Sequence, residues 1–178
     1  MPSIRSSRAI GAVTTRSVAA MGRRGQDSLE DLKARRTAYA LCATAVIVRR
    51  DAITELMDSM RSWDLDLEQA TQKLQQAREM RADVMRTVGA VVVEGPASPA
   101  GSAESAAQHL DVWLDGLAYW IGRGMPDTMR EPDQWRGRLE DKTLTDEAIE
   151  RFVTRCRRVL HPDDDRPARA WRRMLRRR

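Results

Sequence analysis

LEDLKARRTAYALCATAVIVRRDAITELMDSM, residues 29–60, carries the clearest structural pattern in the chain. Apolar side chains recur every three or four positions along it, at Leu29, Leu32, Tyr39, Ala43, Val46, Ile53, Met57 and Met60. Arg36 and Arg50 stand in the two slots that this spacing leaves open. Because such spacing lines one face of a helix, we predict a helix of about 30 residues with a coiled-coil-like stripe. Ser28 is a suitable N-cap for it.

A second helix follows the break RSWDLD, residues 61–66, with Asp64 or Asp66 as its cap. Its apolar stripe comprises Leu67, Ala70, Leu74, Ala77, Val84, Val88 and Val91, and Arg81 fills the missing slot. Two long helices joined by a short turn fold back antiparallel, so we predict a helical hairpin over residues 27–93.

Neither stripe of the predicted hairpin is fully apolar. We therefore expect a third helix, a second copy of the chain or a protein partner to cover residues 29–91. Arg36, Arg50 and Arg81 lie in the stripes, so they need acidic partners or a route to solvent.

Residues 94–103, EGPASPAGSA, have the composition of a linker. A broad apolar face on a further helix follows, made by Ala106, Leu110, Trp113, Leu114, Leu117, Trp120 and Ile121. A short helix with Pro132 at its start carries Trp135. We expect tryptophans 113, 120 and 135 to be core residues because their spacing follows the apolar face.

The last two predicted helices are separated by a proline. Thr145 caps the first of them, and Pro162 ends it because the residue before a proline avoids the helical region. The second covers residues 166–177. Residues 104–178 thus read as a small helical module.

Composition favours the same fold class. The chain has 178 residues, of which 42% are hydrophobic and only 4% aromatic. Its apolar residues are mostly Ala, Val, Leu and Met, which suit helices better than sheets. We predict an all-α protein of one domain or two small modules, with residues 1–26 as a flexible basic arm.

Positive charge is concentrated at the two ends. Residues 1–26 contain five arginines and no acid, and residues 166–178 contain seven arginines and no acid. Arginine binds phosphate through a two-pronged fork, and an interleaved tryptophan can stack on bases. The candidate nucleic-acid-binding residues are therefore Arg166, Arg169, Trp171, Arg172, Arg173, Arg176, Arg177 and Arg178. The alternative is a helix end whose arginines face solvent.

The segment TDEAIERFVTRCRRVLHPD, residues 145–163, ends in His161-Pro162-Asp163. It resembles the basic helix and tripeptide of J-domain co-chaperones, with Ile149, Val153, Cys156 and Leu160 as inward positions and Arg151, Arg155, Arg157 and Arg158 as outward ones. The resemblance implies contact with a chaperone ATPase. The Tyr/Leu pair of that family is poorly matched by the preceding residues. The alternative is a helix stop followed by an acidic cap.

Other function classes lack support in the sequence. Cys42 and Cys156 read as buried free thiols, although one disulfide between them stays open, and two cysteines with two histidines give no zinc spacing. No Gly-rich phosphate loop or nucleophile elbow is present, so we predict no enzyme and no cofactor. The longest apolar run, AYALCATAVIV, is about half the ~20 residues of a membrane span.

These observations predict a non-enzymatic helical interaction or assembly protein that binds DNA or RNA through its arginine-rich termini. One alternative is a structural subunit of a virion or ribonucleoprotein whose termini thread between neighbours. Another is a J-domain-like co-chaperone that uses His161-Pro162-Asp163. We expect a cytoplasmic protein, or one sent to an organelle by residues 1–26 acting as a transit peptide.

Overall fold

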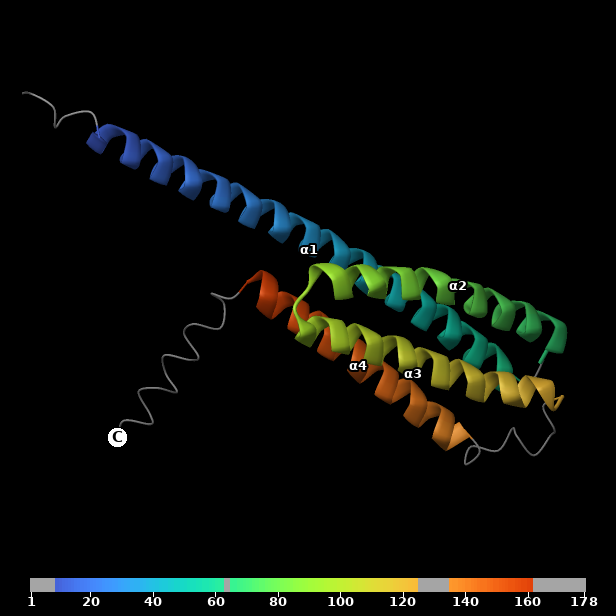
Figure 1. Cartoon of the computed structure of the whole chain (residues 1–178). Helices are drawn as coiled ribbons and strands as arrows, with labels where there is room; N and C mark the ends of the chain where they lie inside the picture. Colours follow the sequence, from blue (N-terminus) through green and yellow to red (C-terminus); the bar gives the residue numbers. More distant parts are fainter. Residues whose placement is uncertain (1–8, 63–64, 125–134, 162–178) are drawn as a thin grey trace, which may run out of the picture.

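A computed structural model describes the backbone of residues 9–62, 65–124 and 135–161, with side chains from residue 28 onward. Four α-helices make up this part of the chain. They are α1 (Ala9–Arg61), α2 (Leu67–Glu94), α3 (Ala97–Gly122) and α4 (Arg136–Leu160) (Figure 1). The described ranges contain no β-strand, so the predicted all-α class is confirmed.

The helices run alternately up and down and close into a bundle. Each packs on its neighbour in the chain, and α4 returns to contact α1. Figure 1 shows α2, α3 and α4 beside the C-terminal half of α1. Short connections force α1 and α2, and α2 and α3, to run antiparallel. The predicted hairpin of α1 and α2 therefore forms. α3 and α4 make a second hairpin that covers it, since Trp120 near the end of α3 meets Trp135 at the start of α4, and Arg155 near the end of α4 contacts Ser98 at the start of α3.

The two apolar stripes and the N-cap of α2 stabilise the hairpin, as the sequence predicts. Tyr39, Val46 and Ile53 of the α1 stripe are buried, as are the predicted α2 positions Ala70, Leu74, Ala77, Val84, Val88 and Val91. Asp66 caps α2, because its carboxylate accepts hydrogen bonds from the backbone N–H groups of Glu68 at 2.9 Å and Gln69 at 3.1 Å.

One hydrophobic core joins all four helices. Its members include Val46 of α1, Val84 of α2, Leu114 of α3 and Phe152 of α4. The hairpin and the later helices thus do not form separate cores within the described residues. Because the stripes of the hairpin are not fully apolar, a further helix was expected to cover them. α3 and α4 do so.

The expected linker at residues 94–103 is helical from Ala97 onward. Only Gly95 and Pro96 connect α2 to α3. Pro99 lies in the first turn of α3, where a missing backbone N–H breaks no helical hydrogen bond. Proline in that position is compatible with a helix, so composition alone misplaces the boundary.

The expected flexible arm is also largely helical. α1 begins at Ala9 and runs without a break through residue 26. Its N-terminal part extends past the end of the bundle (Figure 1). Leu29 and Leu32 lie on this extension and are 62% and 39% exposed. The apolar stripe thus continues beyond the helices that bury it.

α4 is one helix instead of the two predicted. It runs unbroken through Thr145, which was expected to be an N-cap. The Thr145 hydroxyl instead donates a hydrogen bond to the carbonyl oxygen of Asp141 at 2.7 Å, one turn back. No Gly or Pro interrupts residues 138–160, so the helix continues. It ends at Leu160, as Pro162 predicted.

The three tryptophans predicted as core residues are buried: Trp113, Trp120 and Trp135. Trp120 and Trp135 meet edge to face with ring centroids 4.9 Å apart, which pins the start of α4 to the end of α3. Among the helices as described, none combines the length and apolar character that a bilayer crossing requires.

Candidate nucleic-acid interface

The predicted phosphate-binding residues, Arg166 to Arg178, lie outside the described residues, and so does the predicted helix 166–177. Of the tripeptide His161-Pro162-Asp163, only His161 is described. It is exposed and caps the end of α4, and its backbone N–H donates to the carbonyl oxygen of Arg157 at 2.8 Å. The described part of the interface must therefore be built from the helix that leads into the tail.

The C-terminal half of α4 is strongly basic. Residues 151–161 contain Arg151, Arg155, Arg157 and Arg158 and no acid. All four arginines are exposed, whereas Ile149 and Cys156 on the opposite side are buried. The outward positions are thus those predicted, and of the inward ones Val153 and Leu160 are half-buried. In the sequence, His161, Pro162 and three aspartates separate this basic face from the arginine-rich segment 166–178.

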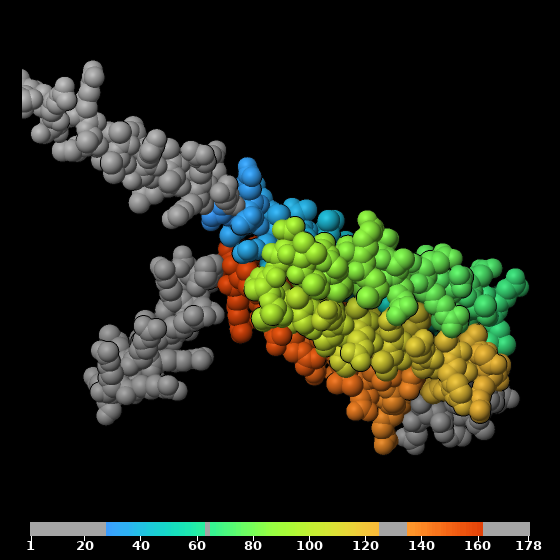
Figure 2. All heavy atoms as spheres, in the orientation of Figure 1, coloured from blue at the N-terminus to red at the C-terminus, as the bar shows by residue number. Residues whose placement is uncertain are grey.

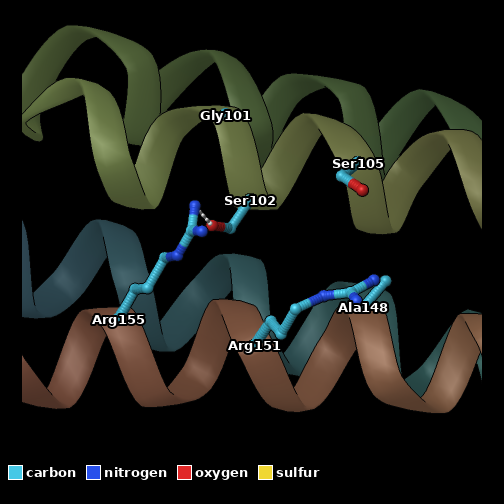
Figure 3. Close-up of a pocket in the computed structure, with 6 residues that line it drawn as sticks. All are labelled: Gly101, Ser102, Ser105, Ala148, Arg151 and Arg155. Carbon is cyan, nitrogen blue, oxygen red and sulfur yellow. Dashed lines mark hydrogen bonds between the residues drawn. The ribbon is translucent and has the colours of Figure 1, made fainter.

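A hollow of about 210 Å³ lies between this face and α3 (Figure 3). Its lining consists of Gly101, Ser102, Ser105, Ala148, Arg151 and Arg155. Arg155 donates hydrogen bonds from Nη1 to the Ser102 hydroxyl at 2.7 Å and to the Ser98 carbonyl oxygen at 3.1 Å. These bonds tie α4 to the first turns of α3.

Two contacts show which helix ends lie together. Arg35 of α1 donates Nε to the carbonyl oxygen of Glu94, the last residue of α2, at 2.8 Å. Arg155, near the end of α4, contacts Ser98 at the start of α3. The end of α4 and the point where α1 leaves the bundle are therefore at the same end of the molecule, as Figures 1 and 2 show.

A different group of arginines is structural. Arg49 is 1% exposed, donates Nε to the carbonyl oxygen of Ala77 at 3.1 Å and pairs with Asp111 through Nη1 at 2.8 Å. Arg81 donates Nε to the other oxygen of Asp111 at 3.0 Å. One carboxylate on α3 thus joins α1 to α2. These charges hold the helices together.

The sequence predicted acidic partners or a route to solvent for Arg36, Arg50 and Arg81, but it missed Arg49. Arg50 pairs with Asp51 at 2.8 Å and with Asp146 at 3.3 Å, and Arg36 is exposed. Arg49 was overlooked because both it and Arg50 fit a 3–4 spacing between the flanking stripe residues.

The two cysteines are buried free thiols, as predicted. Burial raises the pKa of Cys42 from 9.0 to about 11. Burial and the nearby Cys42 thiol raise the pKa of Cys156 to about 12. Both thiols are therefore protonated at neutral pH and are poor nucleophiles.

No cluster of three or more His, Cys, Asp or Glu side chains suited to a metal ion occurs in the described ranges. Comparison of the chain with family models, curated proteins and solved structures gave no match. Two features of the described residues are suited to binding an anion: the basic face of α4 and the hollow between α3 and α4.

Proposed function

We propose that the protein is a non-enzymatic helical assembly protein that binds nucleic acid through its arginine-rich ends. The observation that carries this proposal is where the chain leaves the bundle on the way to those ends. α1 leaves the bundle beside the end of α4, and the last turns of α4 carry exposed arginines. Two basic segments that start from one end of a rigid support can contact one polyanion together.

Simple charge at a helix end is the competing explanation. Arg157 and Arg158 lie in the last turn of α4, where positive charge also stabilises the helix. That effect accounts for two arginines at most. It does not account for Arg151 and Arg155 further back on the helix, or for the seven arginines of residues 166–178.

The proposal is tested by binding to labelled duplex DNA and single-stranded RNA over a salt series. The full chain is compared with a chain truncated after Asp165 and with a chain whose tail arginines are all lysines. Each phosphate contact contributes about 0.9 to the salt slope on duplex DNA. We expect the truncated chain to lose several phosphate contacts and therefore to have a smaller salt slope. The chain whose tail arginines are lysines should keep most of the slope.

Absence of binding by the full chain at low salt would overturn the proposal. Equal salt slopes for the full and truncated chains would show that the interface lies outside residues 166–178. Trp171→Ala separates stacking from charge. If Trp171 stacks on bases, this variant weakens single-stranded RNA binding more than duplex binding.

The second candidate is a structural subunit of a larger assembly, and the exposed stripe on the α1 extension favours it. Leu29 and Leu32 continue the buried stripe beyond the bundle. A neighbouring molecule that packs on the extension would bury them. Light scattering across protein concentrations tests this candidate. Leu29→Ser/Leu32→Ser should reduce any self-association, and a concentration-independent monomer would exclude assembly of the chain with itself.

A further inference from the structure

The hollow between α3 and α4 differs by its charge from two other hollows on the described surface. The hollow between α1 and α2 includes Asp51 and Glu55 in its lining, and the one on the outer face of α4 has Glu147 and Glu150 beside the same Arg151 and Arg155. The α3–α4 hollow is lined by two arginines, two serines and no carboxylate. On its α3 side the two arginines thus meet hydroxyl groups and no acid.

Arg155 is held in place by neutral groups. Both of its acceptors, the Ser98 carbonyl and the Ser102 hydroxyl, are uncharged. Ser102 is itself fixed, since it is 4% exposed and donates its hydroxyl to the same Ser98 carbonyl at 2.8 Å. No carboxylate in the described ranges pairs with Arg155, so its charge is positioned without being neutralised. Its Nε and Nη2 protons remain for a further acceptor.

Arg151 lies one turn before Arg155 and borders the same hollow. Its ion pair with Glu147 is long, at 4.0 Å, and its side chain is 53% exposed. Figure 3 shows Arg155 reaching to Ser102 while Arg151 lies along α4 on the Ser105 side. Residues four apart on a helix have Cβ atoms about 5–6 Å apart. The two guanidinium groups point to different sides of the hollow in Figure 3, so Arg151 has to turn toward Arg155 for both to contact one tetrahedral anion.

From this arrangement we propose that the hollow binds a phosphate group through Arg151 and Arg155, with the hydroxyl of Ser105 as a further donor. The inference rests on the proposed function in one respect. It takes the phosphate to be part of the nucleic-acid backbone, because the hollow lies near the end of the bundle where α4 ends and α1 leaves the bundle. A free phosphorylated small molecule has the same chemistry, and the test distinguishes the two.

The first measurement is the salt slope of nucleic-acid binding by the full chain and by Arg151→Gln/Arg155→Gln. The matched control is Arg78→Gln/Arg86→Gln, which removes the same charge from exposed positions on α2. We expect Arg151→Gln/Arg155→Gln to lower the salt slope by about 1–2, and the control variant to change the slope by less than half of that. Circular dichroism confirms that each variant is folded.

Ser105→Asp provides a second variant that leaves every hydrogen bond of Arg155 intact. It places a carboxylate in the hollow, so it should repel phosphate and lower the slope to the same extent. The second measurement is the backbone amide resonances of Ser102 and Ser105 in the full chain during titration with inorganic phosphate. Saturable shifts that Ser105→Asp abolishes would locate the anion in the hollow.

The outcomes separate this inference from the proposed function. A lower salt slope in both Arg151→Gln/Arg155→Gln and Ser105→Asp supports a backbone phosphate in the hollow. Unchanged slopes with saturable phosphate shifts support the hollow as a site for a free phosphorylated ligand, whether or not nucleic acid binds elsewhere. Unchanged slopes together with unshifted amides overturn the inference, even if the tail truncation proves that nucleic acid is bound.

Discussion

At the scale of single residues, the buried Arg49 is the side chain that most depends on one partner. Its guanidinium is removed from solvent, and Asp111 supplies the compensating charge at 2.8 Å. Asp111 also holds Arg81, whose side chain is 61% exposed. The two arginines thus share a carboxylate but differ in how much they need it, because a buried unpaired charge is far more unfavourable than an exposed one.

Asp111→Asn should therefore lower the free energy of unfolding by about 3 kcal/mol, since it leaves Arg49 buried without a counter-charge. Arg81→Gln should change it by less than about 1 kcal/mol. Urea denaturation measures both. Arg49→Met/Asp111→Leu should regain most of the loss by replacing the pair with apolar packing. A loss below 1 kcal/mol for Asp111→Asn would show that Arg49 does not rely on this carboxylate.

The two thiols predict how stability depends on alkaline pH. Their folded pKa values, about 11 for Cys42 and about 12 for Cys156, exceed the ordinary value of 9.0. Above pH 9 the unfolded chain loses these protons while the folded chain keeps them, so the unfolded state is favoured as pH rises. The free energy of unfolding should fall between pH 9 and pH 11, by at most about 1.4 kcal/mol per pH unit for each thiol.

Urea denaturation under reducing conditions at pH 8, 9 and 10 measures this slope. Cys42→Ala/Cys156→Ala serves as the control, and it should flatten the pH dependence although it lowers stability at every pH. A smaller slope should persist in that variant, because burial also raises the pKa of Tyr39. An unaltered slope in the double variant would assign the pH dependence to other groups.

At the scale of the helices, a glycine lies at the contact between α3 and α4. The Arg138 guanidinium of α4 lies where a Cβ on Gly116 of α3 would be. From there Arg138 pairs with Asp141 at 3.0 Å and lies 5.7 Å from the centroid of the Trp120 ring. The missing side chain of Gly116 thus leaves room for Arg138, although glycine has a low helix propensity.

Gly89 offers the matched comparison, because nothing lies within 4 Å of a Cβ added there. Gly89→Ala should raise the free energy of unfolding by about 0.5–1 kcal/mol, the usual gain inside a helix. Gly116→Ala should lower it by about 1 kcal/mol, because Arg138 must leave its position. Thermal denaturation compares the two, and Arg138→Ala should remove the difference between them. An equal gain at both glycines would mean that Arg138 moves aside freely.

The helices were predictable where a regular apolar stripe meets a packed partner. Residues 67–91 are the clearest case, since every predicted inward position except Leu67 is buried. The stripe could not tell Arg49 from Arg50, because both lie three or four residues from Val46 and Ile53. Neighbouring residues differ by about 100° around a helix, so only the packed structure shows which one faces inward.

Composition was the weaker guide to boundaries and to the site. Pro99 suggested a linker, yet it lies in a first turn, where proline is tolerated. The arginines of the α3–α4 hollow were noted only as outward residues. Their serine partners come from another helix, with Ser102 and Arg155 separated by 53 positions. Such a site exists only after tertiary packing, and no spacing within one segment predicts it.

At the scale of the whole molecule, the number of helices determines where the basic ends lie. In an up-and-down bundle with an even number of helices, the first helix starts at the end where the last one finishes. The α3–α4 hollow lies near the same end, since Arg155 contacts Ser98 in the first turn of α3. The opposite end of the bundle carries the connection between α1 and α2. The fold therefore gives the molecule one basic end and one end remote from it.

If the protein binds nucleic acid as proposed, this polarity predicts which end of the bundle the nucleic acid contacts. A photo-cross-linking amino acid at Ala97, at the basic end, should cross-link labelled duplex DNA several-fold more than one at Ser62, at the remote end. Both positions are exposed and uncharged. They are separated by the length of α2, 28 residues or about 42 Å, which exceeds the reach of the cross-linker. Equal yields at the two positions would mean that the nucleic acid lies along the bundle and is not held at its basic end.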